Sequence, residues 1–295
     1  MVPGSAYVTL VTNDDFVVGA LALGEMLKLV GSRHKFVVAT GPAVSNAAET
    51  IVTGLGYVVH RLSVANSFSN QLRNQGWNRW NSTTQKLHII GLERFEKIVF
   101  LDADVAVLNN RDYLFQRPHL SAVRTRGLLQ IRGKGQYGFN SGVMVLAPNS
   151  TDYERCLAQL PKTAQRMANE DKPWGDQDVF NDVFPDWGLS SHLHLDDGYN
   201  VFWGSIDETI ARRGFSSKGS VQDKYRISVV HFTGPHKPWD RKAAFALKSI
   251  ARPLRHLNRP PTREAMSILL NYFKVIARTK RRIRQVMATN LHGRQ

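Results

Sequence analysis

The chain has very little cysteine and no long run of apolar residues. Cys156 is the single cysteine among 295 residues, so neither an intrachain disulfide nor a cysteine-rich metal site can form. No stretch approaches the roughly eighteen apolar residues that a membrane span requires. Residues 1–15 also lack the basic and apolar regions of a signal peptide. We therefore expect a soluble chain located in the cytoplasm.

The sequence also lacks the glycine-rich loops that commonly bind phosphate. No Gly-x-Gly-x-x-Gly follows the first predicted strand, and no Walker loop is present. The two familiar ways of holding a phosphate on a glycine turn are therefore excluded. A phosphate-bearing ligand would need a metal ion and basic side chains instead.

Acidic residues are scarce in one part of the chain only. Residues 241–295 contain fourteen Lys and Arg but one acid, Glu264, whereas the other 240 residues carry 25 basic and 23 acidic side chains. Most of the net charge of +15 therefore belongs to the C-terminal segment, while the body is nearly neutral. We predict a main domain over residues 1–245 and a basic helical extension over residues 246–295.

Strand and helix patterns alternate along the body in the order of an α/β protein. The expected fold is a Rossmann-like, mostly parallel sheet flanked by helices, and 42% hydrophobic residues suffice for its core. Residues 64–82 are polar and are predicted to form a loop. Strands are predicted at 6–12, 35–40, 57–62, 97–101, 141–146 and 227–232, and helices at 16–29, 45–53, 84–92, 151–160 and 176–184.

Two carboxylates follow the apolar strand at residues 98–101. Side chains two apart in an extended chain point the same way, so Asp102 and Asp104 are expected to converge while Ala103 turns aside. Converging carboxylates repel unless a positive charge lies between them. A hard divalent cation such as Mn²⁺ or Mg²⁺ would satisfy them. The alternative is an acidic strand end that faces water.

Three further clusters contain polar groups suited to a ligand, and each has a simpler explanation. After a second apolar strand, His231 could complete a metal site, Gly234 permits close backbone approach and Lys237 offers charge to a phosphate; the alternative is a buried turn histidine. Phe139-Asn-Ser-Gly142 could bind hydroxyl groups or could form a hairpin-type turn. Trp174-Gly-Asp-Gln-Asp178 begins a helix, where Asp176 could be only the N-cap.

Taken together, these segments resemble glycosyltransferase family 8, and its glycogenin-like and related plant-type members in particular. The resemblance covers roughly residues 6–240 and implies a GT-A fold, a UDP-sugar donor, Mn²⁺ and retention of configuration at the anomeric carbon. The matching segments, in family order, are Thr9-Leu-Val-Thr-Asn-Asp14, Gly19-Ala-Leu-Ala-Leu-Gly24, Lys86-Leu-His88, Phe100-Leu-Asp-Ala-Asp104, Phe139-Asn-Ser-Gly142, Gly175-Asp-Gln177 and His231-Phe-Thr-Gly-Pro-His-Lys-Pro-Trp239.

The resemblance also implies roles for individual residues. The metal ligands would be Asp102, Asp104 and His231. The donor diphosphate would contact Lys86, Gly234 and Lys237, and the uridine would contact Leu10, Asn13 and Phe16. The sugar would lie among Asn140, Ser141, Asp176 and Gln177. Asp176 and Gln177 are the candidates for a group beneath the sugar. Two routes to retention stay open: a covalent intermediate on such a group, or attack by the acceptor on the same face of the sugar from which UDP departs, which is weakly favoured.

The chain departs from glycogenin-like proteins at three places. Thr125 stands where they have an acid in a Ser-Ala-x-x-Asp stretch, and Pro173 replaces the acid three residues before the Asp-Gln pair. The donor sugar therefore stays open among glucose, galactose and glucuronic acid, with a hexose expected. No tyrosine occurs in the seven residues after Tyr199-Asn200, so we expect a separate glycan, protein or lipid-linked acceptor.

Two other functional classes compete with this interpretation. A haloacid-dehalogenase-type phosphatase also begins with four apolar residues and Asp-x-Asp, and would use Asp102 as a nucleophile. It normally has Thr or Val where this chain has Ala106, and its motif stands at the start of the fold. The other competitor is a UDP-sugar-binding protein that has lost catalysis, which the full set of Lys86, Asp102, Asp104, His231 and Lys237 disfavours.

Residues 262–288 are predicted to form a basic amphipathic helix. One alternative docks the helix on the body, and the other lays it on an anionic membrane close to a membrane-associated acceptor. Few aromatics interleave with the charges, which disfavours nucleic acid, and a homodimer is compatible with the sequence. The predicted apolar face contains Met266, Leu269, Leu270, Phe273, Ile276, Ala277, Ile283 and Met287, and the opposite face contains Arg263, Lys274, Arg278, Arg281 and Arg282.

Overall fold

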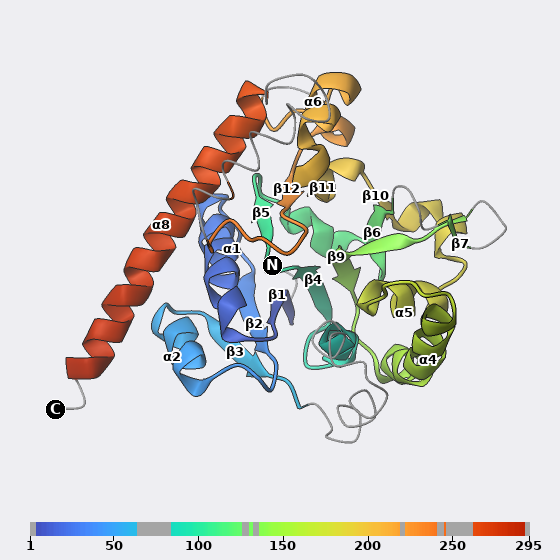
Figure 1. The fold of residues 1–295 in the computed structure, drawn as a ribbon, viewed down its shortest axis with the longest axis horizontal. Coiled ribbons are helices and arrows are strands. Elements are labelled where there is room, and N and C mark those ends of the chain that lie inside the picture. Colours follow the sequence, from blue (N-terminus) through green and yellow to red (C-terminus); the bar gives the residue numbers. More distant parts are fainter. Residues whose placement is uncertain are drawn as a thin grey trace.

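A seven-stranded sheet forms the centre of the molecule, as seen in the computed structural model (Figure 1). The structure describes residues 4–63, 84–125, 130–131, 136–218, 222–240, 245 and 262–292. Strand order is β10-β6-β9-β4-β1-β2-β3. The strands are β1 (Ser5–Val11), β2 (Lys35–Thr40), β3 (Val58–Arg61), β4 (Lys97–Leu101), β6 (Ser121–Arg124), β9 (Phe139–Leu146) and β10 (His194–Leu195).

The sheet is mostly parallel, which confirms the predicted α/β class. β1 pairs in parallel with both β2 and β4, and β2 pairs in parallel with β3. β9 runs antiparallel to its neighbours β4 and β6. The central strands are buried along almost their whole length because helices cover both faces, which explains their continuous apolar sequences.

Successive residues of each central strand pack into different cores. Tyr7 and Val99 join a core beneath α1 (Val17–Leu29), α2 (Asn46–Gly54) and α8 (Arg263–His292). Val8, Ile98 and Phe100 join the core on the opposite face, with the 3-10 helix η3 (Thr84–Gly91), α4 (Ser150–Asn169) and α5 (Asp176–Val183). This two-residue alternation is that of any β-strand, here with both faces apolar.

A smaller sheet lies beyond the carboxyl end of β4. It contains β11 (Val201–Phe202), β12 (Val229–His231) and β5 (Val105–Val107), and β12 pairs antiparallel with β5 so that His231 lies opposite Val105. The amide of Phe232 also donates to the carbonyl of Asp104 at 2.9 Å. This pairing brings two distant segments of the chain together at the edge where β4 ends.

Several predicted element bounds were wrong. The helix predicted at 84–92 is a 3-10 helix, η3, whose residues 84–90 are all buried, so packing outweighs helix propensity. The helix predicted at 151–160 continues past Pro161 to Asn169, where Thr163, Ala164 and Met167 pack inward and offset the lost hydrogen bond. The N-cap at Ser45 is confirmed, because its side chain accepts from the Ala48 amide. The predicted loop at 64–82 lies outside the described residues, as does the break at Arg259-Pro-Pro261.

α8 docks along α1 and α2, as the first of the two alternatives for this helix expected (Figure 1). Its predicted apolar face was correct only in part, because Leu269 and Ile276 are buried whereas Leu270 is 53% exposed and Met287 is 49% exposed. The buried face is rotated from it and contains Ala265, Ile268, Leu269, Tyr272, Ile276 and Thr279. Among the described helices, none is long and apolar enough to cross a membrane. The predicted boundary at 245/246 falls beside residues that the structure does not describe, so it stays a prediction.

Candidate active site

Asp102 and Asp104 lie in the turn that joins β4 to β5, at the carboxyl edge of the sheet. The Asp102 amide donates to the Gly142 carbonyl at 2.9 Å, which ties this turn to β9. Asp104 is buried and Asp102 is half-buried. The turn therefore presents both carboxylates at the place where ligands bind in open α/β sheets, and the alternative of a solvated acidic strand end does not describe Asp104.

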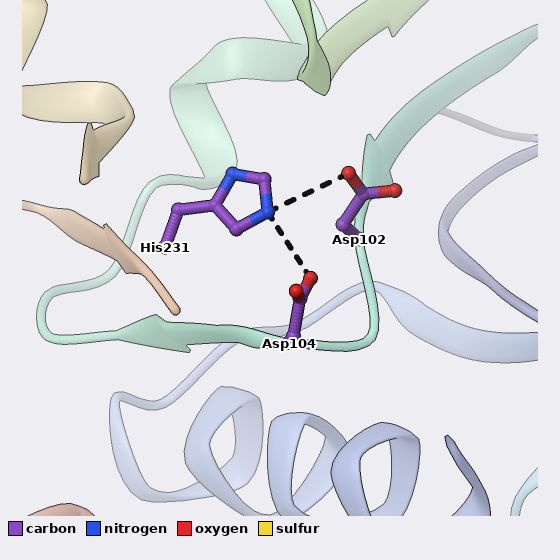
Figure 2. A group of neighbouring side chains, drawn as sticks. All are labelled: Asp102, Asp104 and His231. Carbon is purple, nitrogen blue, oxygen red and sulfur yellow. Dashed lines mark ion pairs between the residues drawn. The ribbon is translucent and has the colours of Figure 1, made fainter. Parts of the chain in front are cut away.

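His231 completes a group of three metal-ligating side chains (Figure 2). Its Nε2 lies 3.1 Å from Asp104 Oδ1 and 3.7 Å from Asp102 Oδ2. One atom from each residue falls within 4.8 Å of the others. The structure thus brings together the three residues that the sequence proposed as ligands, two from the turn between β4 and β5 and one from β12.

Asn200 orients the His231 ring, a contact that sequence reasoning missed. The Asn200 Oδ1 lies 3.0 Å from His231 Nδ1, and both side chains are buried. Nδ1 can donate to that oxygen, which directs Nε2 toward the two carboxylates, the orientation that a metal-ligating histidine would need. Asn200 Nδ2 in turn donates to Asn140 Oδ1 at 2.5 Å. In the sequence, Tyr199-Asn200 served only to mark the position after which no tyrosine follows. No local pattern there indicates that Asn200 hydrogen-bonds to a histidine.

Two lysines neutralise the carboxylates. Lys86 Nζ lies 2.8 Å from Asp102 Oδ1 and 3.0 Å from Asp176 Oδ2, and Lys237 Nζ lies 2.5 Å from Asp104 Oδ2. Each of the two carboxylates therefore has a lysine as a positive partner, besides the metal ion that the sequence led us to expect between them. Both lysines were expected to face a diphosphate, and in the structure each makes an ion pair with a carboxylate.

Burial and charge act against each other in this cluster. Burial raises the pKa of Asp102, and Lys86 and His231 only partly oppose it. Burial acts the same way on Asp104, but His231 and Lys237 outweigh it and hold the pKa of Asp104 well below its usual range. Burial disfavours a charged Lys86, yet Asp102 and Asp176 raise its pKa above the usual value. Lys86 therefore stays charged and Asp104 stays ionised.

The side chains present fit a divalent cation. Each aspartate gives one oxygen to a lysine and turns its other oxygen toward His231 Nε2, so two carboxylate oxygens and one imidazole nitrogen remain available. Oxygen ligands suit Mg²⁺ and Mn²⁺ alike, and an imidazole in the set favours the transition metal. We conclude that Asp102, Asp104 and His231 could hold Mn²⁺ without any change of partner for the lysines.

The four residues proposed to surround a sugar form one hydrogen-bonded network beside Lys86. Ser141 Oγ donates to Asp176 Oδ2 at 2.6 Å, and Asn140 Nδ2 donates to Gln177 Oε1 at 2.8 Å. The N-cap of α5 is Gly175, so the explanation of Asp176 as a cap was wrong. The network instead fixes Asp176 and Gln177 against β9.

The residues proposed for uridine lie where β1 ends and α1 begins. Leu10 is buried near the end of β1, and Asn13 caps the 3-10 turn Asp14–Phe16 by accepting from the Asp15 amide at 3.0 Å. The Phe16 ring packs edge-to-face on Trp239, and Lys237 Nζ lies 5.8 Å from the centre of the Phe16 ring. This segment therefore borders the lysine that pairs with Asp104.

The glycine and threonine singled out in the sequence have clear local structures. Gly234 has a φ of +105°, which a residue with a side chain rarely adopts, so the turn after β12 requires glycine. Thr125 is buried, and both its amide and its hydroxyl donate to the Gly138 carbonyl, at 2.8 and 3.0 Å. The position where glycogenin-like proteins have an acid therefore offers neither a charge nor a free hydroxyl donor here.

Comparison with known proteins agrees with this geometry. The family model described as Glycosyl transferase family 8 matches residues 82–243. Glycogenin-1 of Mus musculus is 34% identical over 237 residues, which cover 80% of this chain and 65% of that protein. Glycogenin-1 of Oryctolagus cuniculus is 34% identical over 249 residues, 83% of this chain and 68% of that protein. The chain thus spans about two thirds of the length of these relatives.

More distant similarities point the same way. UDP-glucuronate:xylan alpha-glucuronosyltransferase 1 of Arabidopsis thaliana is 25% identical over 236 residues, 79% of this chain and 32% of that protein. The crystal structure of the galactosyltransferase LgtC with donor and acceptor sugar analogs superimposes with a TM-score of 0.54 and 17% identity, over 81% of this chain and 91% of that one. The LgtC likeness supports the fold alone. The chain belongs to glycosyltransferase family 8 and has the GT-A fold of glycogenin-like proteins.

Proposed function

We propose that this chain transfers a hexose from a UDP-sugar to a separate acceptor, with Mn²⁺ and with retention of configuration. The observation that carries the proposal is the convergence of Asp102, Asp104 and His231, flanked by the buried lysine Lys86 and by Lys237. Such a site suits a substrate with a diphosphate leaving group, because that group accumulates negative charge as the sugar leaves. Family membership removes the reason to consider the phosphatase alternative.

The protein's part in catalysis is to bind and neutralise the leaving diphosphate. Mn²⁺, when bound, would supply Lewis-acid charge at the phosphate oxygens. Lys237 lies between Asp104 and Phe16, so its ammonium borders both the metal position and the proposed uridine segment. Among the described residues other than its chain neighbours, none has an atom within 4 Å of the position that a Cβ at Gly234 would take, so the turn beside Lys237 has open space for a ligand. A preorganised positive site of this kind stabilises developing charge without reorganisation.

The surroundings of Asp176 support a mechanism in which the acceptor attacks the same face of the sugar from which UDP departs. Its Oδ2 accepts from Ser141 Oγ at 2.6 Å and pairs with Lys86 at 3.0 Å, which reduces its power as a nucleophile. Gln177 Oε1 is likewise occupied, by Asn140 Nδ2 and the Ser141 amide. We therefore favour a phosphate oxygen of UDP as the base that accepts the acceptor's proton, with Asp176 and Gln177 stabilising the positive sugar from below.

The donor sugar and the acceptor are inferred from the chain's departures from its relatives. The names of the relatives include a glucuronosyltransferase and a galactosyltransferase. The absence of an acid at Thr125 leaves no carboxylate there either to select a hydroxyl or to repel a glucuronate, so this position does not choose among the donors and the UDP-sugar panel below must do so. We propose glucose or galactose as the sugar, a separate acceptor because no tyrosine follows Tyr199-Asn200, and the cytoplasm as the location.

A panel of UDP-sugars tests this proposal without a known acceptor. Purified protein is incubated with Mn²⁺ and UDP-glucose, UDP-galactose or UDP-glucuronate, and released UDP is measured. We expect slow hydrolysis of one hexose donor that stops when Mn²⁺ is chelated. UDP binding without any release would identify a binding protein that has lost catalysis. Release of phosphate from phosphate esters, with no release of UDP, would contradict the proposal.

A further inference from the structure

α8 lies behind the segment that carries His231 and Lys237. The Tyr272 ring of α8 stacks on Phe232, with ring centres 4.7 Å apart and planes 6° apart. Phe232 directly follows His231, and its amide donates to the Asp104 carbonyl at 2.9 Å. The beginning of segment 231–239 thus lies between the metal-ligand turn and α8 and contacts both. α8 itself lies outside residues 82–243, the range that the family model matches.

Tyr272 also lies close to the charged cluster. It is fully buried, and in the described part of the chain its hydroxyl has no hydrogen-bond partner. Burial, followed by the negative charge of Asp104, raises the pKa of this hydroxyl. Because its ring stacks on Phe232, the residue directly after His231, Tyr272 supports the segment that carries this metal-ligating histidine.

The end of the same segment is fixed by a second residue of α8. Lys280 Nζ donates to the Trp239 carbonyl at 2.5 Å. Trp239 Nε1 donates to the Asp15 carbonyl at 2.9 Å, and its ring packs on Phe16. A Cβ added at Gly19 would overlap the Trp239 ring, so α1 leaves space for this indole. Trp239 therefore connects α8, the proposed uridine segment and the segment bearing Lys237.

We propose that Tyr272 and Lys280 are positioning residues that hold segment 231–239 in its binding conformation, so that donor affinity depends on α8. The inference rests on the proposed function, because it concerns the UDP part of the donor. The physical reason is that a segment ordered only part of the time binds with an affinity reduced by the fraction that is ordered. α8 removes this loss by fixing both ends of the segment before the donor arrives.

The decisive variant is Lys280→Met, which keeps the aliphatic stem and removes the donor. We expect UDP to bind about tenfold more weakly in the presence of Mn²⁺, the factor associated with losing one hydrogen bond from a charged donor. Lys274→Met is the matched control, since Lys274 is exposed on the same helix. Lys280→Arg, which can still donate to the Trp239 carbonyl, should restore most of the affinity. Affinities are measured by titration calorimetry.

A second comparison separates positioning from loss of stability. Glu25→Gln weakens the docking of α8 elsewhere, because Glu25 pairs with Arg282. At an equal loss of unfolding free energy, Lys280→Met should weaken UDP binding more than Glu25→Gln does. Tyr272→Phe keeps the ring stack and should bind nearly as wild type, whereas Tyr272→Leu should bind more weakly. Equal UDP affinities for wild type and Lys280→Met would overturn the inference.

Hydrogen exchange gives a test that needs neither UDP nor turnover. In the free protein, Lys280→Met should exchange the amides of residues 232–240 faster than wild type, and Lys274→Met should not. If wild type binds no UDP and releases none, the proposed function fails while this measurement still decides the positioning role. If wild type binds UDP but Lys280→Met leaves both affinity and exchange unchanged, only the positioning inference fails.

Discussion

Gly142 lies on β9 directly beside the His231 ring, and a single methyl group there should disable the metal site. A Cβ at this position would lie 2.6 Å from His231 Cε1 and 2.7 Å from Nδ1. Nonbonded carbon atoms need about 3.5 Å, so the ring would have to move by about 1 Å. The ring has little room for this movement, because it is buried and its Nδ1 lies at hydrogen-bond distance, 3.0 Å, from Asn200 Oδ1.

The size of the effect follows from this crowding. Overpacking a buried site costs about 1–3 kcal/mol of unfolding free energy. Metal sites tolerate ligand displacements of only about 0.2 Å, and disturbing the groups that orient a ligating histidine costs about 10–100-fold in metal affinity. We therefore expect Gly142→Ala to lose about 1–3 kcal/mol of stability and at least roughly tenfold in Mn²⁺ affinity.

Gly24→Ala is the control, because a Cβ there would lie 2.7 Å from the Tyr57 ring, which lies outside the metal cluster. Both variants should lower the urea midpoint, while only Gly142→Ala should lower Mn²⁺ affinity, measured from the electron paramagnetic resonance signal of free Mn²⁺. Wild-type Mn²⁺ affinity in Gly142→Ala, or an equal loss in Gly24→Ala, would refute the reasoning.

Three further outcomes are expected. After incubation with UDP-sugar and Mn²⁺, intact-mass spectrometry should find no hexose on the protein, since no tyrosine follows Tyr199-Asn200; a ladder of additions would contradict this. Burial raises the pKa of Cys156 to about 12, so iodoacetamide at pH 8 should modify it only in urea, and rapid labelling of the folded protein would be inconsistent. Because the apolar face of α8 is docked on the body, the protein should not float with anionic liposomes in 0.5 M salt, where only apolar insertion would keep it bound. Flotation that persists in this salt and is abolished by Leu270→Ser would favour the membrane alternative.

The sequence could predict the sheet and three ligand positions because those signals are local. The apolar runs of β1, β4 and β9 are buried on both faces, and the carboxyl ends of parallel strands meet at one edge of the sheet. Asp102 and Asp104 follow this logic, whereas His231 was predicted as the polar end of another apolar strand and joins them from the smaller sheet, where β12 pairs antiparallel with β5. Short strands such as β5 and β11 escaped prediction, because three or two residues show no period.

Features that depend on long-range contacts could not be predicted. Asn200 and His231 are 31 residues apart, and Lys86 reaches Asp102 and Asp176 only after three elements have packed. The buried face of α8 was predicted only in part, because Tyr272 and Thr279, and not Leu270, face the body. Helical periodicity indicates that a face exists, whereas the partner surface decides its angle.

Turnover by Asp104→Asn tests most directly whether the carboxylate–imidazole cluster performs metal-dependent sugar transfer. The amide keeps the shape of the side chain but removes the charge that faces His231 at 3.1 Å and Lys237 at 2.5 Å. With the UDP-sugar that wild type hydrolyses, and with folding verified by circular dichroism, we expect Mn²⁺-dependent UDP release to disappear in Asp104→Asn and likewise in Asp102→Asn. Release by Asp104→Asn at the wild-type rate, with or without chelator, would contradict the assignment of this cluster.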